Sequence, residues 1–217
     1  MKATLAKTIM AAVLTAYLGI CPGVIQAQDA KEKLVELANP TIQAQQTPDI
    51  EAKGVKPKRW KPKDWLEFEV PFVASAPKTA RGEFRSFDEL NFKFYLLLDS
   101  PDKEKRKVLT ADVSYVNVPV GEAVAAVVYL SPTAILNLTG KTRVEPGAAQ
   151  MWGVEVTYNN NLVGFLSSGG KAPGTPAAEW WKSDKAPPQA SGLLKNKTQT
   201  PFAPLWGDYH CEVKASN

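Results

Sequence analysis

The chain has 217 residues, of which 26 are basic, 22 are acidic and 44% are hydrophobic, and its net charge is +4. This length suffices for one domain with a real hydrophobic core. The small net charge argues against nucleic acid as a partner. A zinc site needs three or four nitrogen or sulfur ligands, and the single histidine with Cys211, the one cysteine outside the N-terminal leader, falls short of that number.

The N-terminal residues 1–27 have the form of a secretory signal peptide. Lys2 and Lys7 precede an uncharged apolar run over residues 8–20, which is shorter than the roughly 20 residues needed to cross a bilayer. Length therefore argues against the alternative of an uncleaved anchor. We expect cleavage after Ala27 and export to the periplasm, the outer surface or the medium, without a membrane span in the mature form.

The mature chain would carry 24 basic and 22 acidic residues, a net charge of +2, and one cysteine, Cys211. A single cysteine cannot form an internal disulfide. We expect Cys211 to be a small buried apolar residue.

Residues 28–63 are expected to form a short helix followed by an extended basic arm. The segment 29–38, DAKEKLVELA, consists of helix formers and is followed by Asn39-Pro40, which would end a helix there. From residue 40 to 64 the chain has four prolines, many glutamines and almost no apolar periodicity. That composition is typical of an extended arm or tether.

Residues 64–217 predict a domain made of β-strands. In 64–75 apolar residues alternate with Glu67 and Glu69, as in a half-buried strand whose carboxylates face solvent. Similar alternation runs through 90–99 and 107–120, whereas 122–132 is almost continuously apolar, as in a strand buried on both faces.

The C-terminal half continues this pattern. The segment 150–168 alternates on both sides of Asn159-Asn160-Asn161, which predicts a β-hairpin because asparagine tolerates positive φ. A last strand is expected within 205–215, and 133–140 fits either a one-turn helix or a strand edge. We predict an all-β fold, an immunoglobulin-like antiparallel β-sandwich.

No pattern of residues supports an enzyme active site. His210 and Cys211 are neighbours on an expected strand, so their side chains would point to opposite faces and could not form a base and nucleophile pair. His210 is interpreted as a structural or surface histidine, and Glu67 with Glu69 as a charged strand face. We therefore predict that the protein is not an enzyme and uses no cofactor or metal.

One candidate binding site is a basic run within the arm. It contains Lys53, Lys56, Lys58, Arg59, Lys61 and Lys63, with Trp60 among them and no acidic residue. Such a run could hold an acidic glycan, a phosphate-rich envelope polymer or the acidic face of a protein. The alternative is a solvated tether kept extended by charge and proline.

A second candidate is the pair Trp180-Trp181, which lies between loops rich in glycine and proline. Adjacent aromatic rings can offer a stacking surface to sugars or to a protein. They can equally fold back to cap the end of the sandwich.

The leader, the arm KPKRWKPKDWLEFEVPF and the strand LNFKFYLLLD together resemble a small family of secreted proteins. Its members are encoded with type IV pilus assembly genes in mucus-dwelling gut bacteria. The resemblance implies an immunoglobulin-like sandwich that takes part in pilus assembly, adhesion or host surface contact. We expect a monomer in isolation whose partners are pilus or envelope proteins, or host surface glycans or receptors, met through end loops or sheet edges. The alternative function is a carbohydrate-binding module that uses the loop tryptophans.

Overall fold

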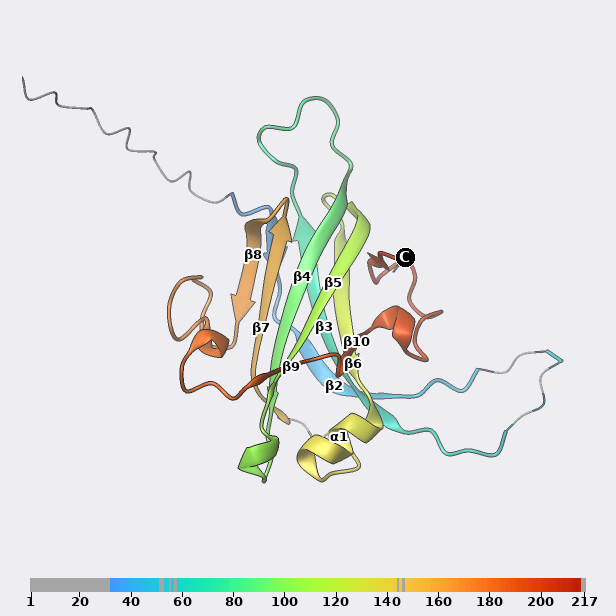
Figure 1. Ribbon diagram of the computed structural model, residues 1–217. Helices are drawn as coiled ribbons and strands as arrows, with labels where there is room; N and C mark the ends of the chain where they lie inside the picture. The colour runs from blue at the N-terminus through green and yellow to red at the C-terminus, as the bar shows by residue number, and fades with distance from the viewer. Residues whose placement is uncertain are drawn as a thin grey trace, which may run out of the picture.

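The computed structural model describes residues 32–50, 53–54, 56, 58–143, 145 and 147–215, so the expected signal peptide lies outside the described residues. Two β-sheets pack face to face (Figure 1). The strands are β1 Val35–Leu37, β2 Thr41–Gln46, β3 Asp64–Ala74, β4 Ser86–Leu98, β5 Val108–Pro119, β6 Ala123–Leu130, β7 Ala149–Tyr158, β8 Asn161–Ser167, β9 Gln189–Ser191, β10 Leu194–Asn196 and β11 Glu212–Val213. The helices are α1 Pro132–Thr139 and three 3₁₀ turns, Lys103–Lys105, Trp180–Lys182 and Lys197–Gln199.

The two sheets have simple orders. One runs β1-β3-β6-β10, with β2 also paired to β3, and the other runs β11-β5-β4-β7-β8, with β9 also paired to β5. All these pairings are antiparallel except that of β5 with β9. The predicted β-sandwich is therefore confirmed. In the described part of the chain, no helix has the length and apolarity to cross a membrane.

Alternating side chains of the two sheets build the core between them. Phe68 of β3 meets Phe94 of β4 edge to face at 5.5 Å between ring centroids, and Phe72 meets Phe92 at 4.9 Å. Burying rings of this size stabilises the fold by about 1.5–3 kcal/mol each. The strand predicted to be buried on both faces is confirmed in β6, where residues 124–130 are all buried.

A tyrosine hydroxyl ties the two sheets together inside this core. Tyr115 of β5 is fully buried; its hydroxyl donates to the carbonyl of Val127 in β6 at 3.1 Å and accepts from the amide of Val127 at 2.9 Å. One side chain therefore satisfies both backbone groups of a residue in the opposite sheet. Unpaired, those groups would cost free energy in a buried place.

The helix predicted over 29–38 is wrong for the part that the structure describes, because Val35–Leu37 forms strand β1. This strand pairs with residues 72–74 of β3, and β2 pairs with residues 64–69 of the same strand. The register between the two pairings shifts by one residue at Asn39-Pro40, as in a β-bulge. A helix of ten residues is marginal on its own, and pairing with β3 outweighs its propensity.

The extended arm predicted over residues 40–63 is likewise corrected. Its first part is strand β2, and the amide of Thr47 donates to the carbonyl of Lys63 at 2.9 Å. The rest is therefore a loop whose two ends lie beside each other, rather than a tether attached at one end. Near the start of the described chain, the amide of Leu34 donates to the carbonyl of Val163 in β8 at 3.0 Å, which connects the two sheets along one side.

Two local structures follow from their sequences. The stretch that fitted either a helix or a strand edge is helix α1, which Ser131 caps by accepting from the amide of Ala134 and which ends at Gly140 with φ +74°. In the predicted hairpin, Asn159 and Asn160 adopt φ values of 48° and 63° between β7 and β8, so the hairpin is confirmed.

Candidate binding site: the basic loop and the pocket at its base

The loop between β2 and β3, residues 47–63, carries the basic run and is called the basic loop below. Its described basic side chains are all exposed, and Trp60 is 50% exposed. None of them forms an ion pair with an acidic residue that the structure describes. The described parts of the loop extend away from the sandwich (Figure 1), so their charge faces solvent. These exposed residues include the predicted site residues Lys56, Lys58, Arg59, Trp60 and Lys61.

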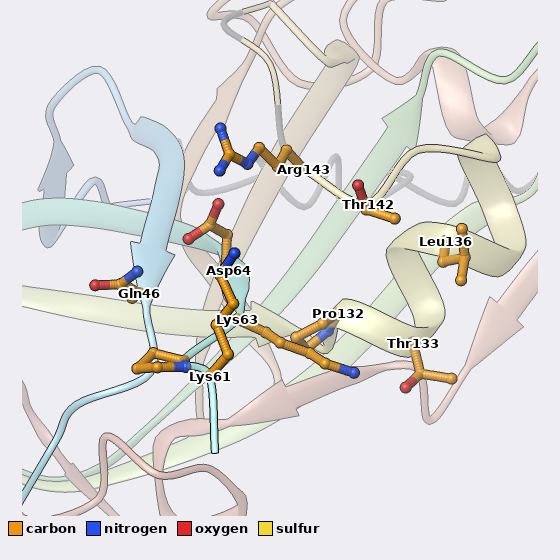
Figure 2. A pocket seen from close by; sticks show the side chains of 10 residues that line it. Gln46, Lys61, Lys63, Asp64, Pro132, Thr133, Leu136, Thr142 and Arg143 are labelled. Atoms are coloured by element: carbon orange, nitrogen blue, oxygen red, sulfur yellow. The ribbon is translucent and has the colours of Figure 1, made fainter. Parts of the chain in front are cut away.

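A pocket of about 280 Å³ lies where this loop returns to the sandwich, and is called the loop-base pocket below. The end of β2, the end of the basic loop, the start of α1 and the segment after α1 form its walls (Figure 2). It is lined by Gln46, Lys61, Pro62, Lys63, Asp64, Pro132, Thr133, Leu136, Thr142 and Arg143.

Positive charge predominates in the loop-base pocket. Lys61, Lys63 and Arg143 line it together with one carboxylate, that of Asp64. Figure 2 shows Arg143 and the two lysines on opposite sides of Asp64. Sequence reasoning found Lys61 but missed Arg143, because Arg143 lies about eighty residues further along the chain and no local pattern connects the two.

The tryptophan pair does not form an open stacking surface. Trp180 is 7% exposed and Trp181 is 3% exposed. The Trp181 ring stacks on Tyr95 at 4.1 Å between centroids, and it lies so close to Gly153 that any side chain there would collide with it. The two rings fold back onto the protein, but they cover the outer face of the β4–β7 sheet rather than the end of the sandwich, and at this burial they offer no open ring face to a sugar.

The carboxylates of Glu67 and Glu69 in β3 do not lie on a solvent-facing side of the sheet, in contrast to the prediction. Glu67 is 3% exposed and accepts from the Tyr129 hydroxyl at 3.0 Å and from Nε2 of Gln43 at 3.1 Å. The C-terminal segment 197–210 covers this face, where Phe202 stacks on Tyr129 at 4.6 Å. Alternation places a residue on a face, but it does not say whether a distant segment covers that face.

His210 belongs to the same covered face. Its Nε2 lies 2.9 Å from Oε2 of Glu69, and its Nδ1 is buried without a hydrogen-bond partner. Because a carboxylate only accepts, the neutral ring carries its hydrogen on Nε2. Burial lowers the pKa of His210, against the opposing effect of the bond to Glu69.

Cys211 packs into the main core, whereas its neighbour His210 faces Glu69. Burial raises the pKa of the Cys211 thiol to about 12, so the two residues do not form a nucleophile and base pair. Cys211 is buried, as predicted. Among the residues that the structure describes, no three or more His, Cys, Asp or Glu side chains gather in a way that could hold a metal ion.

Comparison with known proteins assigns the chain to a family. One protein-family model matches residues 26–217. The chain belongs to that family. The fold of this chain is similar to that of a protein from Akkermansia muciniphila whose crystal structure is known. The two chains are 32% identical, the TM-score is 0.69, and the match covers 85% of this chain and 94% of the other. No curated protein matches the chain. The resemblance to proteins of mucus-dwelling gut bacteria is thus confirmed at the level of family and fold.

Proposed function

We propose that the protein is an exported, non-enzymatic interaction protein that associates with type IV pilus components or other envelope proteins. One observation carries the proposal: an uncharged edge strand, β2, continues directly into the exposed basic loop. The strand can pair with a partner's backbone, and the loop can attract that partner when it is acidic.

The free edge of β2 is defined by its pairing with β3. Thr47 donates to Lys63 and therefore directs its backbone groups toward β3. In an antiparallel pair this direction alternates along the strand. Ile42, Ala44 and Gln46 then direct their amides and carbonyls away from β3, toward the free edge.

This edge lacks the features that usually prevent strands from pairing with other chains. Its sequence, TIQAQQ, contains no charged residue and no proline. Among the other described strands at the sheet margins, β8 meets Leu34 along its outer edge, β1, β9 and β10 have three residues each, and β11 has two. Strand β2, with six residues, is therefore the outer strand best suited to strand addition.

The basic loop supplies attraction over a longer range. Exposed lysines and arginines mainly raise the rate at which an acidic partner associates, and salt screens this effect. Trp60, half exposed within that charge, offers a ring of the kind that often dominates binding energy at interfaces. The loop and the β2 edge are contiguous, so one partner can contact both.

Purified pilin and pilus-assembly proteins of the same bacterium test this proposal by surface plasmon resonance. Replacing Lys56, Lys58 and Arg59 by glutamine should slow association about tenfold at low salt. Ala44→Pro should speed dissociation, because it removes an outward amide without removing a bond to β3. Ala44→Thr keeps that amide and is the matched control.

Two results would contradict the proposal. One is the absence of saturable binding to any of these proteins. The other is binding by both variants with unchanged rates. A deletion of residues 40–63 is not a suitable test, because it would remove β2 together with the loop.

A further inference from the structure

We infer that the loop-base pocket binds a tetrahedral oxyanion ester, namely a sulfate or phosphate group carried by a sugar-sized molecule. The inference deepens the proposed function, because it rests on the basic loop meeting an anionic partner and names the chemical group that is recognised. It depends on a different set of side chains from the exposed loop residues Lys56, Lys58 and Arg59, which do not line the pocket.

Three cationic groups around one small hollow favour a ligand with several anionic oxygens. The Arg143 guanidinium can donate to two oxygens in parallel, and the side chains of Lys61 and Lys63 start on the other side of Asp64, with one ammonium group extended past Pro132 toward Thr133 (Figure 2). A carboxylate offers only two oxygens, both of which a single guanidinium can occupy. A sulfate or phosphate monoester has three free oxygens and can bond to both sides at once.

The remaining lining fits the group that carries this ester. Thr133, Thr142 and Gln46 offer hydroxyl and amide groups, and Leu136, which is 44% exposed, provides an apolar wall with Pro132. The volume of about 280 Å³ lies just below the usual lower limit of small-molecule pockets. It accommodates one sugar ring with its ester better than a larger ligand.

Asp64 explains why an ester is preferred to the bare ion. Its carboxylate lies between the cationic groups and repels inorganic sulfate, which has no hydrogen to donate, more than inorganic phosphate, which keeps at least one hydroxyl group. A sugar hydroxyl can donate to that carboxylate and turn the repulsion into a hydrogen bond. Asp64 thus selects a ligand that has hydroxyl groups next to its anionic group.

Titration of the protein with four compounds, followed by amide chemical shifts, tests the inference. The compounds are inorganic sulfate, inorganic phosphate, glucose 6-sulfate and glucose 6-phosphate. At least one sugar ester should bind saturably, with a Kd on the order of a millimolar or less, about tenfold tighter than the matching inorganic ion. The shifted amides should include those of Thr133 and Thr142. The two ester arms show whether sulfate or phosphate is the better group.

Variants with the same change of charge separate the pocket from the loop. Arg143→Gln should weaken the sugar ester about tenfold, whereas Lys58→Gln, on the basic loop outside the pocket, should change its Kd less than about twofold. Asp64→Asn should tighten the inorganic ion and abolish the preference for the ester.

Equal losses in Arg143→Gln and Lys58→Gln would overturn the inference, as would the absence of saturable shifts with either ester. If pilus proteins still bound through the basic loop in that case, the proposed function would stand and only the ligand assignment would fall.

Discussion

Removing a single hydroxyl group by Tyr115→Phe should destabilise the fold strongly. In the folded protein this hydroxyl bonds both the amide and the carbonyl of Val127, and neither Tyr115 nor Val127 is more than 1% exposed. A buried backbone group left without a partner costs about 1–3 kcal/mol. For two such groups we expect a loss of about 3 kcal/mol in the free energy of unfolding.

Urea denaturation followed by circular dichroism measures this loss. With a slope of about 2 kcal/mol per molar urea, the midpoint should fall by about 1.5 M while the slope stays constant. Tyr209→Phe is the matched control, because that hydroxyl lies at the surface and donates to Glu69 over 3.3 Å. We expect the control to change stability by less than about 0.5 kcal/mol. Equal midpoints for Tyr115→Phe and the control would refute this account of the core.

Three further predictions concern buried groups. Burial holds the pKa of His210 below its ordinary value of 6.5, so the contribution of this residue to the free energy of unfolding is complete above pH 6.5 and declines as the pH falls below it. His210→Gln should therefore reduce the decline of the urea midpoint between about pH 7 and 5.5. The same decline in the variant and in the parent protein would contradict the assignment. Gly153→Ala places a Cβ against the Trp181 ring and should cost about 1–3 kcal/mol and alter the near-UV circular dichroism, whereas a native spectrum would show that the ring can move aside. With its pKa raised to about 12, Cys211 should resist iodoacetamide at pH 8 until urea is added, as peptide mass spectrometry can measure; rapid labelling of the native protein would disprove its burial.

The long strands could be predicted from sequence because each carries its own periodic signal. The alternation around Phe68 and Phe94 predicted β3 and β4, and the asparagines after Tyr158 predicted the turn between β7 and β8. In these segments local preference and burial agree, so a window of ten residues contains the information. The spacing of turns between such segments was enough to predict a sandwich.

The remaining features depend on neighbours that are distant in the chain. Strand β1 has the composition of a helix, and only its pairing with β3, some forty residues later, makes it a strand. Glu67 alternates as a solvent-facing residue does, yet segment 197–210 covers it. Arg143 reaches the loop-base pocket because α1 turns the chain toward the base of the basic loop. The periodicity of residues within one segment contains no information about these contacts between distant segments.

The bond between Thr47 and Lys63 determines how far the basic loop can reach. Because both ends of the loop are fixed, half of the fifteen residues between Thr47 and Lys63 must lead away from the sheet and half must lead back. The tip of the loop can therefore lie at most about 25 Å from the sheet. A tether of the same length, attached at one end only, could reach about twice as far and in any direction, whereas the basic loop cannot. In the proposed interaction, an acidic partner bound to the basic loop would therefore lie beside the free edge of β2, because both ends of the loop are fixed next to that sheet.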